Sequence, residues 1–224
     1  VLLLFITLSF KEPEKHKTIE KKKPAVLADI IKRSLQNKKL LGLFLYSFIV
    51  IGVLNTIFVI YQPYFRATGL PLYLYGIVFA ILSIFTGLTA LKAHDIEKKL
   101  GVYGSLMIMP LFLVGSLIGA SFVFVWFGFV FFFLREMIRG FIFPVLDDYT
   151  NKIAISSERA TVLSIGSMFA RLGMVVISTT VGFMSDAFGL KIILLYTGLI
   201  LLGFTLIVPV LINRNKSKSL SKIH

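Results

Sequence analysis

Residues 40–65 read LLGLFLYSFIVIGVLNTIFVIYQPYF, which is 26 residues without one charged side chain. A helix needs about 20 apolar residues to cross the hydrocarbon core of a bilayer, which is roughly 30 Å thick. Apolar runs inside soluble domains are usually shorter, about 10–14 residues. The stretch 40–65 therefore predicts one membrane-spanning helix.

Further apolar stretches of similar length follow along the chain. They are 67–91, 100–134 together with 140–146, 160–185, which only Arg171 interrupts, and 192–213. As one helix, 100–146 would be about 70 Å long at 1.5 Å per residue, so it must fold back once. The small residues between 115 and 121 predict the turn there, with the next helix over 122–146. The predicted fold is an all-α integral membrane protein with six transmembrane helices in a domain over residues 40–213.

The composition agrees with a membrane protein. Hydrophobic residues make up 57% of the chain and charged residues 16%, with a net charge of +13. Soluble domains carry about 45–50% apolar and about 25% charged residues. This composition excludes a soluble enzyme, a disordered chain and a secreted disulfide scaffold. The chain has no cysteine, which excludes thiol catalysis and cysteine-ligated metal sites.

The positive charges predict the orientation in the membrane. Nineteen of the 24 Lys and Arg residues fall on one side of the predicted helices, and only Arg66 and Lys191 fall on the other. Because positively charged loops stay in the cytoplasm, the linker 11–39 and the tail 214–224 are expected there. Residues 1–10 are too short to span a bilayer and are interpreted as the end of a preceding transmembrane helix.

The basic linker 11–39 has two interpretations. It is either a solvated segment that sets the topology, or it contains a short helix on the inner membrane surface. Pro24 suits a first helical turn, and four apolar residues fall on one helical face: Leu27, Ile30, Ile31 and Leu35. Nucleic-acid binding is disfavoured, because the linker lacks interleaved aromatic residues and any nucleic-acid-binding motif.

Four ionisable residues lie within predicted spans: Arg135, Glu136 and Arg139 in the fourth, and Arg171 in the fifth. Such residues cost about 2.5–3.5 kcal/mol each on insertion scales and are functional candidates by default. Glu136 and Arg171 lie at similar depths, about 15 and 17 Å from the inner helix ends. They are predicted to meet, either as a structural ion pair or beside a translocation cavity. Either acids on a missing partner half balance the excess positive charge, or the cavity favours anionic groups.

Weaker candidates are polar residues elsewhere on the spans. Asn55 and Gln62 share a helical face and either line a cavity or make interhelical hydrogen bonds. The adjacent Asp147 and Asp148 follow Pro144 at an inner helix end, where a loop anchor or gate contact is expected. No nucleotide-binding, hydrolase or metal motif is present, so the sequence predicts no cofactor and no metal site.

Several short motifs carry a resemblance to a known family by their order and spacing. They are YQPYF at 61–65, AHDIEKKLG at 93–101, DDYTN at 147–151, ERATVLS at 158–164 and GFMSDAFG at 182–189. Together with the six predicted spans and the basic linker, they resemble the carboxyl-terminal half of a major facilitator superfamily transporter. The segment 93–101 is expected to be the loop between the eighth and ninth helices of that fold.

The resemblance implies the second half of a 12-helix fold that moves a small solute or drug by alternating access, with protons as the coupling ion. The expected partners are the lipid bilayer, the solute, protons and an amino-terminal six-helix half missing from this chain. The expected location is a bacterial or archaeal plasma membrane. Candidates for the substrate and ion pathway are Asn55, Gln62, Arg135, Glu136, Arg139 and Arg171. Gate or latch candidates are Asp95, Asp147, Asp148, Glu158, Arg159 and Asp186.

Two other classes of membrane protein are alternatives to a secondary transporter. A six-helix domain of an ATP-driven transporter would present a coupling helix to a nucleotide-binding partner, and a channel would need a re-entrant filter. An intramembrane enzyme would need a nucleophile, histidine or metal ligands clustered at one depth. The sequence lacks such a cluster, so no enzymatic activity is expected.

Overall fold

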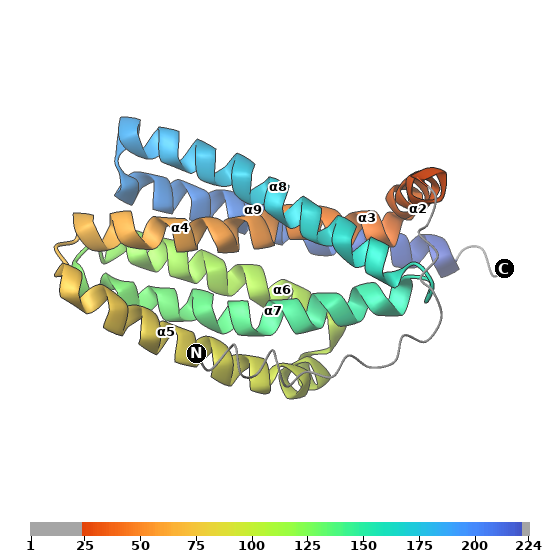
Figure 1. Ribbon diagram of the computed structural model, residues 1–224, viewed down its shortest axis with the longest axis horizontal. Coiled ribbons are helices and arrows are strands. Elements are labelled where there is room, and N and C mark those ends of the chain that lie inside the picture. Colours follow the sequence, from red (N-terminus) through yellow and green to blue (C-terminus); the bar gives the residue numbers. More distant parts are fainter. Residues whose placement is uncertain (1–23, 221–224) are drawn as a thin grey trace, which may run out of the picture.

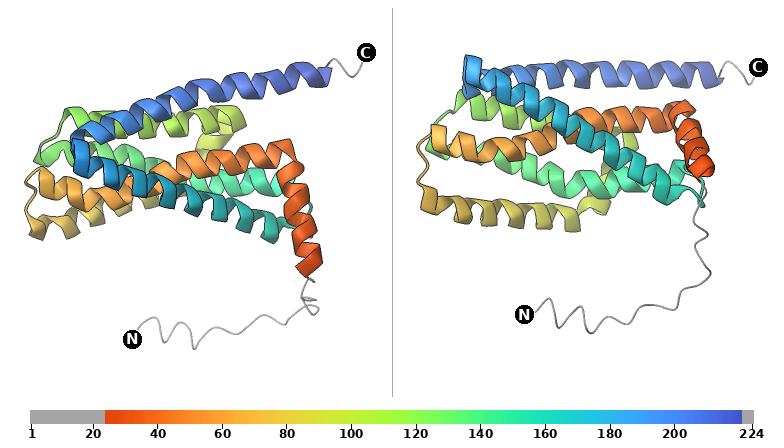
Figure 2. Two further views of the ribbon diagram at one scale, coloured as in Figure 1. Left: turned by 90° about the horizontal axis from the view of Figure 1, so that it is seen from above. Right: turned by 45° about the horizontal axis from the view of Figure 1, so that its top comes forward.

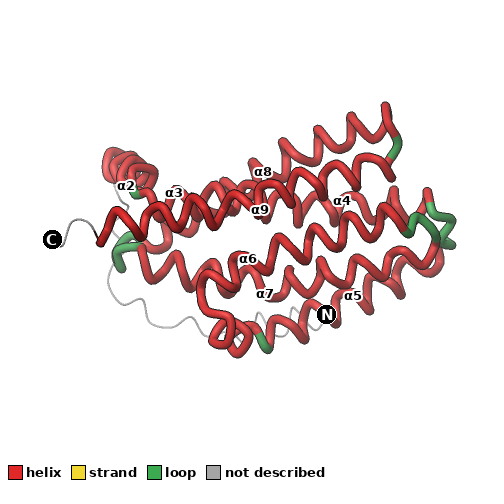
Figure 3. The backbone as a smooth tube through the Cα atoms, turned by 180° about the vertical axis from the view of Figure 1, so that it is seen from behind, coloured by secondary structure: helices red, strands yellow, loops and turns green. Residues whose placement is uncertain are grey.

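The computed structural model describes residues 24–220, and the side chains within them except at 24, 102–103 and 207–220. Throughout this range the regular elements are helices, and no strand is present (Figure 3). The predicted helix end at 1–10, the first part of the basic linker and residues 221–224 lie outside the described residues.

The long helices run back and forth along one axis and are joined by short turns (Figure 1). In chain order the elements are α2 (Pro24–Gln36), α3 (Lys38–Tyr46), the π-helix η1 (Ser47–Ile51), α4 (Gly52–Ala67), the 3-10 helix η2 (Leu72–Leu74), α5 (Tyr75–Leu91), α6 (Ala93–Phe122), the 3-10 helix η3 (Trp126–Phe131), α7 (Phe132–Ile153), α8 (Arg159–Phe188) and α9 (Leu190–Leu220). The connections α5–α6 and α7–α8 lie toward the end of the bundle that carries α2. The predicted basic segments therefore gather toward one end.

Four helical segments of the described chain are long and apolar enough to cross a membrane. They are Lys38–Ala67, Leu72–Leu91, Gly104–Phe122 and Arg159–Phe188. The apolar segment Leu190–Leu206 is shorter, and α7 carries Arg135, Glu136 and Arg139 within its length. The structure thus confirms an all-helical membrane fold, and the count of six spans stays a prediction.

The predicted turn at 115–121 is wrong, because these residues lie inside α6. The helix ends later, at Val123, whose backbone is no longer helical (φ −97°, ψ 62°). The small residues serve close packing instead. A Cβ atom at Gly119 would overlap the ring of Phe131 from the returning segment, so this glycine lets η3 lie against α6.

The segment 93–101, predicted as a loop, is instead helical up to a sharp backbone turn. Residues 93–100 form the first turns of α6, and Gly101 then leaves the helical conformation with φ +67°. Ala93 is 2% exposed and packs into the core, which anchors this short helix. The apolar span Gly104–Phe122 begins beyond the turn.

Helix α2 lies across the end of the bundle and packs against α3 and α8 (Figure 2). Its contact face is narrower than the predicted apolar face. Ile30 and Ser34 are buried, whereas Leu27, Ile31 and Leu35 are each more than one third exposed. The exposed apolar side chains are therefore free to contact a membrane surface.

Helix α8 crosses the α3–η1–α4 segment at a point of very close backbone approach. A Cβ atom at Gly52 would lie 2.8 Å from the carbonyl carbon of Gly173. A Cβ atom at Gly173 would lie 2.7 Å from the carbonyl carbon of Phe48 and would overlap its oxygen. Small residues allow helix backbones to approach this closely in membranes. The π-helix η1 faces α8 at this crossing.

Candidate functional site

The centre of the bundle holds a buried pair of opposite charges on the first turns of α7. Arg135 and Glu136 are each 1% exposed. The Nε and Nη2 atoms of Arg135 donate hydrogen bonds of 3.0 and 2.9 Å to the Leu54 carbonyl on α4. Its Nη1 atom pairs with Oε1 of Glu136. Arg135 therefore joins α7 to α4 while it neutralises the adjacent carboxylate.

Glu136 connects α7 to two other helices through both carboxylate oxygens. Oε1 accepts a 2.8 Å hydrogen bond from the Tyr61 hydroxyl on α4, and Oε2 accepts a 2.5 Å hydrogen bond from the Thr86 hydroxyl on α5. Nη1 of Arg139 lies 3.6 Å from Oε2. Close packing of α5 and α7 makes the Thr86 contact possible, since a Cβ atom at Gly140 would lie 2.9 Å from the Ala90 nitrogen.

Aromatic rings surround the two guanidinium groups of α7. The guanidinium carbon of Arg135 lies 5.6 Å from the ring centres of both Phe58 and Tyr61, and that of Arg139 lies 5.8 Å from Phe58. Tyr61 also stacks on Phe132 with ring centres 4.4 Å apart. These distances allow cation–π attraction, which stabilises positive charge away from water. Two arginines share one glutamate, so the cluster carries a net charge of +1.

The structure does not form the predicted pair between Glu136 and Arg171. Arg135, next to Glu136 on the same helix, occupies the carboxylate instead. Arg171 is exposed on α8, and among the described side chains it has no ion-pair or hydrogen-bond partner. The prediction used the similar depth of the two residues and the adjacency of consecutive spans, but the rotation of α8 turns Arg171 toward a different space.

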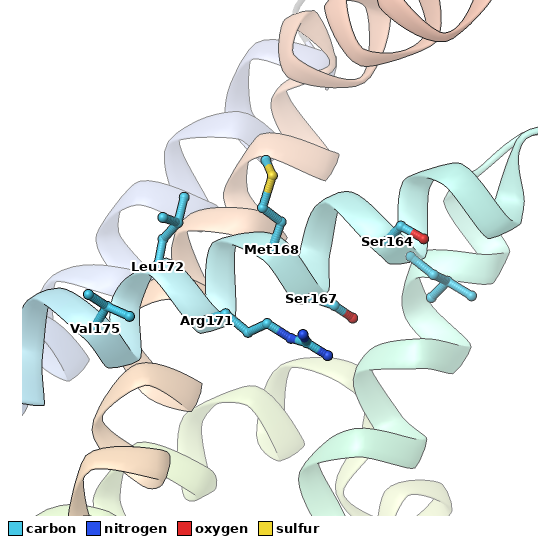
Figure 4. Close-up of a pocket in the computed structure, with 7 residues that line it drawn as sticks. Ser164, Ser167, Met168, Arg171, Leu172 and Val175 are labelled. Carbon is cyan, nitrogen blue, oxygen red and sulfur yellow. The ribbon is translucent and has the colours of Figure 1, made fainter.

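That space is an open groove along α8 with a volume of about 580 Å³. Its lining residues are Leu163, Ser164, Ser167, Met168, Arg171, Leu172 and Val175. Figure 4 shows Arg171, Ser167 and Ser164 on the same side of the helix, and Met168 on another side. One side of the groove is therefore polar, with Ser164, Ser167 and Arg171, and the rest of its lining is apolar.

The polar residues predicted on α4 lie outside the buried cluster. Asn55 is half-buried and Gln62 is exposed, and within the described range neither side chain makes a hydrogen bond. The helix contributes Tyr61 and the Leu54 carbonyl instead. Sequence reasoning missed Tyr61 and Thr86 as partners of Glu136. The usable signal was a hydroxyl group within an otherwise apolar span, at a depth near that of the carboxylate.

The gate candidates divide into paired and exposed residues. Nη2 of Arg33 on α2 lies 2.9 Å from Oε1 of Glu158, which precedes α8, and Nε of Arg33 lies 3.0 Å from Asp29. Lys152, beyond the apolar part of α7, pairs with Asp148 and lies 3.9 Å from Glu97. Four further candidates are exposed and form no ion pair with a described residue: Asp95, Asp147, Arg159 and Asp186.

The acidic partners of Lys152 determine the direction in which its pKa is shifted. The hydrogen bond with Asp148 raises the pKa of Lys152, with smaller contributions from the charges of Asp148 and Glu97. A raised lysine pKa means that the contact is fully present below the ordinary lysine pKa and is lost as the pH rises through the higher value. The contact therefore persists across the physiological range.

The Arg33–Glu158 contact is expected to contribute little to stability. Arg33 is 49% exposed, and exposed ion pairs contribute about 0–1 kcal/mol. Arg33→Gln should lower the free energy of unfolding by less than about 1 kcal/mol, measured by denaturant unfolding in detergent. Lys32→Gln, an exposed neighbour, is the matched control. A loss for Arg33→Gln of more than about 2 kcal/mol beyond the control would contradict this assignment.

Within residues 24–220, no group of three or more His, Cys, Asp or Glu side chains is placed to hold a metal ion. No match is found among curated proteins. A family model described as Major Facilitator Superfamily matches residues 1–178. The chain, with its apolar helices and charged cluster inside the bundle, therefore belongs to the Major Facilitator Superfamily and is an integral membrane transport protein.

Proposed function

We propose that the chain is the carboxyl-terminal six-helix half of a secondary transporter that moves a small solute or drug by alternating access, coupled to protons. The observation that carries the proposal is the carboxylate of Glu136, the one buried acid among the described side chains, which is bonded at once to α4, α5 and its own helix. Ionisable groups placed this way in transporters commonly mark proton relays.

Protonation of Glu136 would change contacts between helices. The carboxylate accepts hydrogen bonds from Tyr61 and Thr86 and neutralises Arg135. A protonated carboxyl group carries no charge, and one of its oxygens becomes a donor, so the group accepts hydrogen bonds less strongly. Proton binding would therefore weaken the contacts of α7 with α4 and α5 and leave Arg135 without its counter-charge. Proton binding at Glu136 would thus change how α4, α5 and α7 lie relative to one another.

We further propose that residues 11–39 and the tail lie in the cytoplasm of a bacterial or archaeal cell, and that an amino-terminal six-helix half completes the transporter. The asymmetry of the positive charges supports the orientation. Two apolar spans are widely exposed, which supports a second half. Only 17% of the span Leu72–Leu91 and 22% of the span Arg159–Phe188 are buried. Helices exposed on this scale have room for further packing partners.

Proton coupling is tested with Glu136→Gln in the full-length protein, reconstituted into liposomes. Gln keeps the size and hydrogen-bonding oxygen of Glu but does not titrate. We expect accumulation driven by a pH gradient to fall to background, while exchange of solute across the membrane stays within about twofold of wild type. The measurement screens a panel of labelled sugars, amino acids, organic acids and cationic dyes. The solute that wild type accumulates is then used for the variants.

Asp29→Asn, an acid on the exposed face of α2, is the matched control and should leave accumulation unchanged. Gradient-driven accumulation in Glu136→Gln with the pH dependence of wild type would show that Glu136 is not the proton carrier. Loss of exchange together with accumulation would indicate a structural role for the carboxylate.

A further inference from the structure

Arg171 is the charged residue that the buried cluster leaves unexplained. Arg135 and Arg139 share Glu136 and lie against aromatic rings. Arg171, by contrast, makes no ion pair, hydrogen bond or ring contact with any described side chain. It lies about 18 Å from the start and about 26 Å from the end of α8, at 1.5 Å per residue. A guanidinium this far inside an apolar span requires a compensating group.

The groove along α8 gives this guanidinium a polar neighbour. Ser167 lies four residues before Arg171, so the two side chains share a face, as Figure 4 shows. The Ser167 hydroxyl has no hydrogen-bond partner among the described residues. Ser164, one turn further, donates its hydroxyl to the Ala160 carbonyl at 2.9 Å and so offers only lone pairs. Arg171 and Ser167 are therefore the free donors of the groove.

The composition of the groove determines which ligand it suits. No acidic residue lines it, so its formal charge is +1. The remaining lining residues are apolar: Leu163, Met168, Leu172 and Val175. The groove is open, and all of its lining residues lie on α8, so it contacts a ligand from one side. A small molecule with an anionic end and an apolar body complements both parts.

We propose that the α8 groove binds the carboxylate of an amphipathic organic anion, with Arg171 donating two parallel hydrogen bonds and Ser167 a third. Arg is suited to this task because its planar fork matches the two carboxylate oxygens. The apolar body of the ligand lies along Met168, Leu172 and Val175. The proposal rests on the proposed transport function and names the class of its substrate.

The test uses the full-length protein in phosphatidylcholine nanodiscs, with radiolabelled benzoate as the probe. Benzamide and benzylamine are competitors of the same shape, neutral and positive. We expect saturable benzoate binding that unlabelled benzoate displaces and that neither analogue displaces. Arg171→Gln should weaken benzoate at least about tenfold, as expected for loss of hydrogen bonds to a charged group. Arg171→Lys should be intermediate, and Ser167→Ala should weaken binding about threefold.

Arg66→Gln, an exposed arginine at the other end of the bundle's first span, is the matched control and should bind benzoate as wild type does. Nanodiscs with added phosphatidylglycerol distinguish a lipid headgroup from a free solute. If the anionic lipid displaces benzoate, the groove belongs to lipid and the proposed substrate class is wrong. Unchanged benzoate binding in those nanodiscs supports a free organic anion.

Three results would overturn the proposal. The first is no saturable benzoate binding to wild type, and the second is equal displacement of benzoate by all three compounds. The third is a combined result for two variants. Arg171→Gln unfolds, whereas Arg171→Lys folds but binds benzoate no better than benzamide. Arg171 would then pair with an acid elsewhere in the transporter. A protein that accumulates solute under a pH gradient without preferring benzoate keeps the proposed function and loses only this site. Benzoate binding without any gradient-driven accumulation keeps this site and contradicts the proposed proton-coupled transport.

Discussion

Glu136→Ala should lower the free energy of unfolding by about 3–5 kcal/mol, the usual cost of removing one partner from a buried ion pair. The variant leaves Arg135, which is 1% exposed, without its counter-charge. It also leaves the hydroxyls of Tyr61 and Thr86 without their acceptor. Unfolding in detergent, followed by circular dichroism against urea or dodecyl sulfate, measures the loss.

The double variant Arg135→Met, Glu136→Leu separates the charge effect from a packing effect. Replacing both members of a buried pair by apolar residues of similar volume is often neutral or stabilising. We therefore expect the double variant to recover most of the stability that Glu136→Ala loses. Equal losses in the single and the double variant would contradict an unpaired arginine as the cause. Glu136→Gln should lose less than Glu136→Ala, because it keeps acceptors for the two hydroxyls.

Gly173→Leu should separate α8 from η1 and α4 and destabilise the bundle by about 3 kcal/mol or more, at or above the upper end of typical overpacking costs. The added Cβ atom would lie 2.9 Å from the Phe48 Cα atom and closer still to its carbonyl group. Backbone atoms cannot rotate away as a flexible side chain can. One of the two helices must move. Thermal unfolding in detergent should show the loss.

Gly182→Leu on the same helix is the control, because a Cβ atom there has no neighbour within 4 Å. This variant removes the same intrinsic helix penalty of glycine without an added clash, so its stability should equal or exceed that of wild type. Gly173→Ala should fall between the two leucine variants. If Gly173→Leu were as stable as Gly182→Leu, the close approach of α8 to η1 would not exist in the protein.

Most of the helical fold could be predicted from apolar length. The stretch 40–65 corresponds to the span Lys38–Ala67, and 67–91 and 160–185 correspond to the spans Leu72–Leu91 and Arg159–Phe188. Two predictions differ from the structure: 93–101, predicted as a loop, is helical up to Gly101, and the small residues at 115–121, which predict a turn, lie inside α6. Small residues have two uses in membrane helices, turns and close packing, and the sequence does not distinguish between them. The contact of Gly119 with Phe131 decided in favour of packing.

The site was predicted in its members but not in its connections. Depth along the spans singled out Arg135, Glu136, Arg139 and Arg171 as candidates. It paired Glu136 with Arg171, although Arg135 stood next to it in the sequence. Adjacent residues on a helix point about 100° apart, so an adjacent pair is not the expected arrangement. Here the side chains of Arg135 and Glu136 are long enough to bridge that angle. Arg135 at the same time donates to the Leu54 carbonyl on α4.

The sequence by itself determined that this chain is a helical membrane protein with charged residues inside its spans. That conclusion needs only the thickness of the bilayer and the cost of burying charge, both of which act on each segment separately. The tertiary structure alone decided that Tyr61 and Thr86, 75 and 50 residues away from Glu136, bind it, and that Arg171 faces a groove. These contacts depend on how each helix is rotated about its axis and where it crosses its neighbours. Rotation and crossing follow from side-chain packing across the whole bundle, which no single segment specifies.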